Sequence, residues 1–334
     1  MTESDQLIEA FDSRVQRRNE RRDLFRMVLG TAAVGGAFAF VSAADAQTVS
    51  DNDVLNFALN LEYLEANFYY YAVFGTPIPV GSINGVGTAV PADQAANAAG
   101  VRYNTGAHAV PFQDPIVAQY AREIVADELA HVNFLRSALT SAAAVAQPSI
   151  DIGTTPNGAF SSAARAAGLI GPTSAANPTF FDPYASDNNF LLGAFIFEDV
   201  GVTAYKGASP LITSKAYLEA AAGILSVEAY HASIVRTVLY SKGVATPSLR
   251  TSADAISAAR DSLDGTASDD QGISPINTSM GVTSNIVPTD QNSIAYSRNT
   301  GQVLNVVYLN KAAVTAGGFF PAGVNGSIKT SQAN

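Results

Sequence analysis

Residues 123–135 read EIVADELAHVNFL and contain the pattern that decides the fold. His131 follows Glu128 by three residues, and in an α-helix this spacing puts both side chains on one face, one turn apart. The same face carries the apolar side chains of Ile124 and Leu135. The pattern therefore predicts a helix that turns a carboxylate and an imidazole towards an apolar core.

A second Glu-x-x-His pattern lies further along the chain. Residues 223–235 read GILSVEAYHASIV, in which Glu228 and His231 share a face with Ile224 and Val235. The chain contains three histidines, and two of them stand in this pattern. Two chance occurrences have a probability of about one in a thousand, so the repeat indicates two helices that contribute to one site.

Four segments show helical periodicity together with helix start and stop signals. The signals include the N-cap residue Ser50 and the pair Asp114-Pro115. The four helices are expected at about 50–75, 114–145, 187–207 and 209–243. Shorter helices are expected near 161–167 and 251–263, and periodicity leaves the apolar run 302–309 open between helix and strand. The long loops 75–112 and 148–186 are of a kind that is often functional.

Each of the four expected helices carries a glutamate near its middle. Besides Glu128 and Glu228, these are Glu62 in the first helix and Glu198 in the third. A carboxylate on an apolar face costs several kcal/mol unless something compensates its charge. Two divalent cations bridged by carboxylates would remove that cost, and mixed glutamate and histidine ligation suits iron or manganese better than magnesium, calcium or zinc.

Composition excludes several other classes of protein. The 334 residues include 19 basic and 29 acidic side chains, and the net charge of −10 argues against a nucleic-acid partner. The absence of cysteine excludes disulfides, iron–sulfur clusters and thiolate zinc sites. Beyond the N-terminal region no stretch of about 20 apolar residues is free of charge, so we expect no transmembrane span in the mature chain.

The first 46 residues have the features of an export signal. Arg21-Arg22 precedes an apolar stretch over 27–44, which ends in Ala44-Asp45-Ala46, an A-x-A cleavage pattern. The paired arginines resemble a twin-arginine signal, although the usual Phe-Leu order after them is reversed. We expect cleavage after Ala46 and a location in the periplasm or cell envelope. The alternative is an uncleaved membrane anchor.

The order Glu, Glu-x-x-His, Glu, Glu-x-x-His resembles the ferritin-like superfamily of dinuclear carboxylate proteins. The resemblance implies an all-α core, an antiparallel four-helix bundle over residues 47–243 with one long crossover between its halves. It also implies two iron or two manganese ions as cofactor. Residues 244–334 would form a partly irregular extension packed on the bundle. The segments 285–290 and 302–305 resemble the desiccation-related branch of bacteria and plants.

The resemblance also assigns the site residues. The implied metal ligands are Glu62, Glu128, His131, Glu198, Glu228 and His231. The two lone glutamates would be terminal ligands, the glutamates of the two Glu-x-x-His patterns would bridge, and each histidine would bind one ion.

Four further residues are expected around the ligands. Tyr69 and Tyr205 each follow a lone glutamate by seven residues, which gives the two halves a pseudo-twofold relation, although buried structural tyrosines are the commoner case. Glu65 shares a helix face with Glu62 and is either an alternative ligand or an exposed neighbour. Asp127 is expected to support a ligand or to be solvated.

Two kinds of function fit these features. The leading hypothesis is redox chemistry with a small oxidant, either oxidation of Fe(II) by oxygen or peroxide, or peroxide disproportionation, in stress protection. The rival is a non-catalytic envelope protein for desiccation tolerance with structural metals, or a subunit of a cell-surface assembly. The sequence assigns no catalytic residue and leaves a homo-oligomer open.

Overall fold

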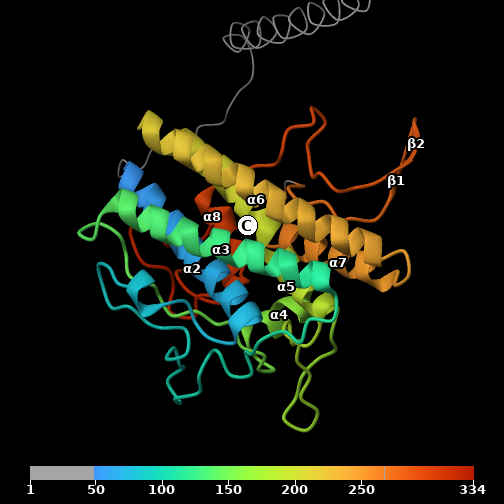
Figure 1. The fold of residues 1–334 in the computed structure, drawn as a ribbon, viewed down its shortest axis with the longest axis horizontal. Coiled ribbons are helices and arrows are strands. Elements are labelled where there is room, and N and C mark those ends of the chain that lie inside the picture. The colour runs from blue at the N-terminus through green and yellow to red at the C-terminus, as the bar shows by residue number, and fades with distance from the viewer. Residues whose placement is uncertain (1–48, 267) are drawn as a thin grey trace, which may run out of the picture. The chain divides into compact units, whose positions relative to one another are not determined.

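The structure is a computed structural model, and it describes residues 49–266 and 268–334 (Figure 1). The expected signal peptide lies outside these residues. Four long helices make up the centre of the described part: α2 (Asp51–Phe74), α3 (Pro115–Leu139), α5 (Asp187–Ala208) and α6 (Lys215–Lys242). Among the described residues, no helix combines the length and apolar character that a bilayer span requires.

Helix ends form where the sequence carries capping residues. The Ser50 hydroxyl accepts a hydrogen bond from the Asp53 backbone, and the Asp53 side chain caps Ser50 in return. Asp114 caps α3 ahead of Pro115, and Gly75 ends α2 in the left-handed conformation with φ 69°. These contacts satisfy backbone groups that a helix end otherwise leaves without partners.

Two helix boundaries differ from the sequence-based expectation. Helix α3 ends at Leu139 instead of near Val145, because the chain turns at Thr140 with φ 66°. Positive φ is rare for a β-branched residue, so no sequence signal announces this break. The segment Ser209–Leu211 forms a 3₁₀ turn, η2, and α6 begins only at Lys215 behind its own N-cap, Ser214.

Neighbouring helices of the bundle run antiparallel. Ala72, near the end of α2, accepts a hydrogen bond from Val110, which lies just before α3. At the other end of this pair, the Asn56 side chain donates to Ala143 at 3.0 Å. An ion pair between Asp114 and Lys242 joins the N-terminus of α3 to the C-terminus of α6. The crossover between the halves contains helix α4 (Ala159–Ala166). The all-α fold class expected from the sequence is confirmed.

The chain beyond α6 returns to the bundle. It contains α7 (Ser248–Asp261), the antiparallel strands β1 (Ile276–Thr278) and β2 (Gly281–Thr283), and α8 (Thr300–Tyr308). The undecided run 302–309 is therefore mainly helical. Elsewhere, a short 3₁₀ turn, η1 (Val80–Ser82), lies in the long loop between α2 and α3. Figure 1 shows the β1–β2 hairpin projecting from the bundle, whereas the Phe319 ring packs 4.9 Å from the Phe197 ring of α5.

A chain of buried ion pairs joins this C-terminal part to α5 and α6. It links three arginines and three aspartates: Arg236, Asp199, Arg260, Asp270, Arg298 and Asp264. Arg236 and Arg260 lie 2.7 and 2.9 Å from the same oxygen of Asp199. Arg236 also donates to four backbone carbonyls in segments 271–272 and 285–286. Buried charges need such partners, so the bundle and its C-terminal part depend on each other.

Candidate metal centre

The six predicted ligands converge in the middle of the bundle. One comes from α2, two from α3, one from α5 and two from α6, and every one of them is at least 92% buried. They form two overlapping groups, Glu62–Glu128–His131–Glu228 and Glu128–Glu198–Glu228–His231. Within each group one ligand atom per residue lies within 4.8 Å of the others. The helical spacing of the two Glu-x-x-His patterns is what places these atoms together.

Each histidine turns the same ring nitrogen towards the carboxylates. His131 Nδ1 lies 3.3 Å from Glu62 and 3.5 Å from Glu228. His231 Nδ1 lies 3.0 Å from Glu128 and 3.7 Å from Glu198. The two groups share Glu128 and Glu228, the glutamates to which the family resemblance assigns a bridging role.

The same atoms lack ordinary hydrogen-bond partners. Among the described residues, eight buried polar atoms of the cluster have none: Glu62 Oε2, both oxygens of Glu128, Glu198 Oε2, both oxygens of Glu228, and Nδ1 of both histidines. Buried polar atoms are nearly always satisfied, and each exception needs a reason. Divalent cations held by carboxylate oxygens and imidazole nitrogens would satisfy all eight, so the residues fit a dinuclear site.

Two tyrosines cross between the halves of the bundle. The Tyr69 hydroxyl of α2 donates to Glu198 Oε1 on α5, and the Tyr205 hydroxyl of α5 donates to Glu62 Oε1 on α2. Each lone glutamate thus has one oxygen held by a phenol and the other oxygen facing the cluster. The seven-residue spacing between each lone glutamate and its following tyrosine therefore corresponds to two reciprocal hydrogen bonds between α2 and α5.

Asp127 orients one of the histidines. Its carboxylate lies 3.2 Å from His231 Nε2, on the side of the ring away from the cluster. A carboxylate on the outer nitrogen fixes the tautomer of the ring, so that Nδ1 is free to act as a ligand. The Asp127 side chain is 43% exposed, so this edge of the site, between α3 and α6, lies close to solvent.

Burial and mutual repulsion control the protonation of the cluster. Burial, with the charges of neighbouring glutamates, raises the pKa values of Glu128 and Glu228 well above the ordinary range. Burial also raises the pKa of Glu198 to about 8, although the Tyr69 hydrogen bond opposes this. Burial acts to lower the pKa of His131, but the nearby carboxylate of Glu62 and the charge of Asp127 outweigh it, and the net shift is upward.

His231 differs from His131 in this respect. Burial lowers the pKa of His231, and the contact with Asp127 offsets the shift only in part. Without metal, the native state therefore favours the protonated forms of Glu128, Glu198 and Glu228 beside a neutral His231. Bound cations would reverse the preference of the carboxylates and agree with that of His231, because carboxylates and imidazoles bind metal in their deprotonated forms.

Glu65 and Gly201 complete the inner surface of the site. Glu65 is 6% exposed, so the expectation of an exposed neighbour is wrong, and it lies outside both ligand groups. Burial and the charges of Glu62 and Glu198 raise its pKa well above the ordinary range. A methyl group at Gly201 would overlap Glu228 Oε2 and lie 3.5 Å from Glu65 Oε1. The sequence analysis missed Gly201, although a glycine inside a helix, three residues after a ligand, is a signal of close approach.

Helices that bring four glutamates and two histidines into one buried cluster define the class of dinuclear carboxylate bundles. Residues 50–241 match the family model of the ferritin-like domain, and the chain belongs to this family. The expected ferritin-like resemblance is thereby confirmed at the level of the family.

Two characterised relatives are similar over long stretches. A desiccation-related protein of Craterostigma plantagineum is 32% identical over 195 residues, which cover 58% of this chain and 54% of that protein, so the match spans about half of the relative. A ferritin-like catalase of Nesocodon mauritianus is 26% identical over 287 residues, which cover 84% of this chain and 85% of that protein. No solved structure matches the chain.

Proposed function

We propose that this protein binds two iron or two manganese ions and disproportionates hydrogen peroxide as a protection against oxidative stress. The observation that carries the proposal is the set of eight buried candidate ligand atoms, without hydrogen-bond partners in the described part of the chain, in two groups that share Glu128 and Glu228. The relative named a ferritin-like catalase, which aligns over most of both chains, supports peroxide as the oxidant.

The chemistry balances without an external reductant. When bound, a pair of redox-active ions supplies two electrons to one peroxide and recovers them from a second, so that 2 H₂O₂ give 2 H₂O and O₂. The residues of this chain hold the site in shape for that exchange. Tyr205 and Tyr69 fix one oxygen each of Glu62 and Glu198, and Asp127 fixes the ring of His231.

Burial excludes larger substrates and bulk water from the cluster. Glu62, Glu128 and Glu228 are 0% exposed, and apolar side chains of the core surround them. A small uncharged molecule such as peroxide can enter a site of this kind, whereas an organic substrate cannot. We therefore propose that the protein acts on peroxide, and that Fe(II) is the other candidate substrate, as a reductant that oxygen or peroxide oxidises. We propose no activity on organic compounds.

The test combines metal analysis with oxygen release. The mature protein should bind close to two equivalents of Mn(II) or Fe(II) and release oxygen from peroxide. The double variant Glu128→Ala, His131→Ala should lose metal binding, and His231→Ala should lose oxygen release. His108→Ala is the matched control, because His108 is the third histidine and is exposed in a loop. Unchanged stoichiometry in the double variant would refute the metal centre.

A structural role for the metals is the second candidate, and the desiccation-related relative favours it. In that case the loaded protein would leave both peroxide and Fe(II) unchanged over hours, while metal would still raise its melting temperature.

We also propose that the protein is exported to the periplasm or cell envelope, which agrees with the arginine pair and cleavage pattern at the N-terminus.

A further inference from the structure

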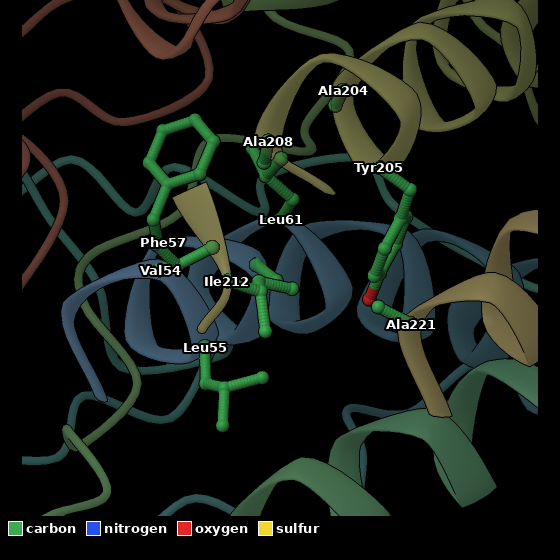
Figure 2. A pocket seen from close by; sticks show the side chains of 10 residues that line it. Val54, Leu55, Phe57, Leu61, Ala204, Tyr205, Ala208, Ile212 and Ala221 are labelled. Carbon is green, nitrogen blue, oxygen red and sulfur yellow. The ribbon is translucent and has the colours of Figure 1, made fainter. Parts of the chain in front are cut away.

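An apolar cavity lies at the contact between α2, α5 and the start of α6, and Figure 2 shows its walls. Leu55, Phe57 and Leu61 of α2 line one side, and Ile212 and Ala221 line another. The centre of a water-sized molecule can move within about 20 Å³ of it, which is room for a diatomic molecule and too little for an organic substrate.

Tyr205 connects this cavity to the metal centre. Its ring lines the cavity, and in Figure 2 its oxygen is the only oxygen among the labelled side chains. The same hydroxyl donates to Glu62 Oε1. The other oxygen of this carboxylate, Oε2, is the one that faces the cluster. The cavity therefore ends one side chain away from the site.

The lining of the cavity selects by polarity. Water or hydrogen peroxide would lose hydrogen bonds there that the apolar walls cannot replace, because the Tyr205 hydroxyl already donates to Glu62, and this loss costs free energy. Dioxygen has no such bonds to lose, and dry apolar cavities of this kind accept apolar gases such as xenon. The cavity thus suits dioxygen and disfavours peroxide.

The opposite edge of the site has the contrary character. There, between α3 and α6, the half-exposed Asp127 carboxylate contacts His231, and the His131 side chain is 10% exposed. Polar molecules that approach along this edge can keep hydrogen bonds to water and to the Asp127 carboxylate. The two sides of the cluster thus differ in the kind of molecule that each can admit.

We propose that the apolar cavity beside Tyr205 is a dioxygen site, through which the O₂ formed from peroxide leaves the metal centre. The exit role rests on the proposed peroxide disproportionation, which forms one O₂ and two water molecules from two molecules of peroxide. The gas site itself rests only on the cavity and its lining.

Xenon is the probe for the gas site. Crystals of the full mature protein under xenon pressure should show an atom bounded by Leu61, Tyr205 and Ala221, with or without metal. Ala221→Leu should remove it by filling the space, and Ala221→Val, a smaller change, serves if the leucine variant does not fold. Xenon absent from this cavity, or bound instead in the neighbouring cavity lined by Glu65 and Gly201, would overturn the proposal.

Turnover tests the exit role. Ala221→Leu should still bind two metal equivalents, and its kcat for oxygen release should fall about fivefold or more while kcat/KM for peroxide stays the same, because product release becomes slower. Ala259→Leu is the matched control, since Ala259 lines a similar apolar cavity that no predicted ligand or its tyrosine partner touches. Wild-type kcat in a metal-loaded Ala221→Leu protein would refute the exit role. A wild-type protein that consumes no peroxide would refute the proposed function instead, and xenon occupancy would still decide the gas site.

Discussion

Replacement of Glu198 by glutamine should make the metal-free protein more stable. Burial raises the pKa of Glu198 from 4.5 to about 8, with the charges of Asp199 and Glu62 adding to the shift and the Tyr69 hydrogen bond opposing it. The native state therefore penalises the ionised form. A glutamine keeps an oxygen that can accept from Tyr69 and carries no charge at any pH.

The size of the effect follows from this pKa difference and depends on pH. Because the folded-state pKa is raised, the contribution of Glu198 to stability is complete below its unfolded value of 4.5 and is lost as the pH rises through about 8. At about 1.4 kcal/mol per pKa unit, the loss is below about 1 kcal/mol at pH 5 and about 3 kcal/mol at pH 7. The variant avoids this loss, and its melting temperature at pH 7 should rise on the order of 5–10 °C.

Thermal and urea unfolding with a chelator present would measure the effect at pH 5, 7 and 8. The control is Glu123→Gln on the same bundle, because Glu123 is exposed and its replacement should change little. With Mn(II) present the order should reverse, since the variant has lost a ligand and gains less from metal. A metal-free Glu198→Gln protein no more stable than wild type at pH 7 and 8 would mean that the carboxylates do not repel each other as the structure indicates.

Three further outcomes are expected. Asp127→Asn should weaken Mn(II) binding about 10–100-fold, measured by titration calorimetry, because the ring of His231 loses its orienting carboxylate; unchanged affinity would contradict that role. Arg298→Met should lower the free energy of unfolding by about 3–5 kcal/mol in urea, since it leaves the buried Asp264 without its arginine, and a change below about 1 kcal/mol would count against the ion-pair chain. Joint replacement of Arg21 and Arg22 by lysine should retain the precursor in the cytoplasm on cell fractionation, whereas normal export would point to another pathway.

The sequence was most informative where helical spacing alone sets the geometry. The i,i+3 patterns at Glu128 and Glu228, and the N-caps at Ser50 and Asp114, depend on contacts within one helix, so they could be read locally. Convergence of the six candidate ligands followed from a resemblance of motif order, and the structure places those side chains together. The ligand roles themselves stay a prediction that metal binding must test.

Features that depend on distant segments could not be predicted in the same way. The burial of Glu65 arises from packing between helices, and the break at Thr140 depends on a positive φ that its sequence does not predict. The Asp199–Arg236 pair joins residues from α5 and α6, and nothing in the local sequence of either helix announces its partner. The β1–β2 hairpin was missed because each strand has only three residues and no alternation of buried and exposed positions.

The buried ion-pair chain also constrains the order in which the chain can fold during synthesis. Arg236 of α6 draws most of its hydrogen bonds from carbonyls at 271–272 and 285–286, which leave the ribosome long after α6 itself. Until those segments are made, a nascent bundle would have to bury a guanidinium with only Asp199 as its partner, which is costly. The four helices can associate early, but the native bundle closes only after segments 271–272 and 285–286 have also been made.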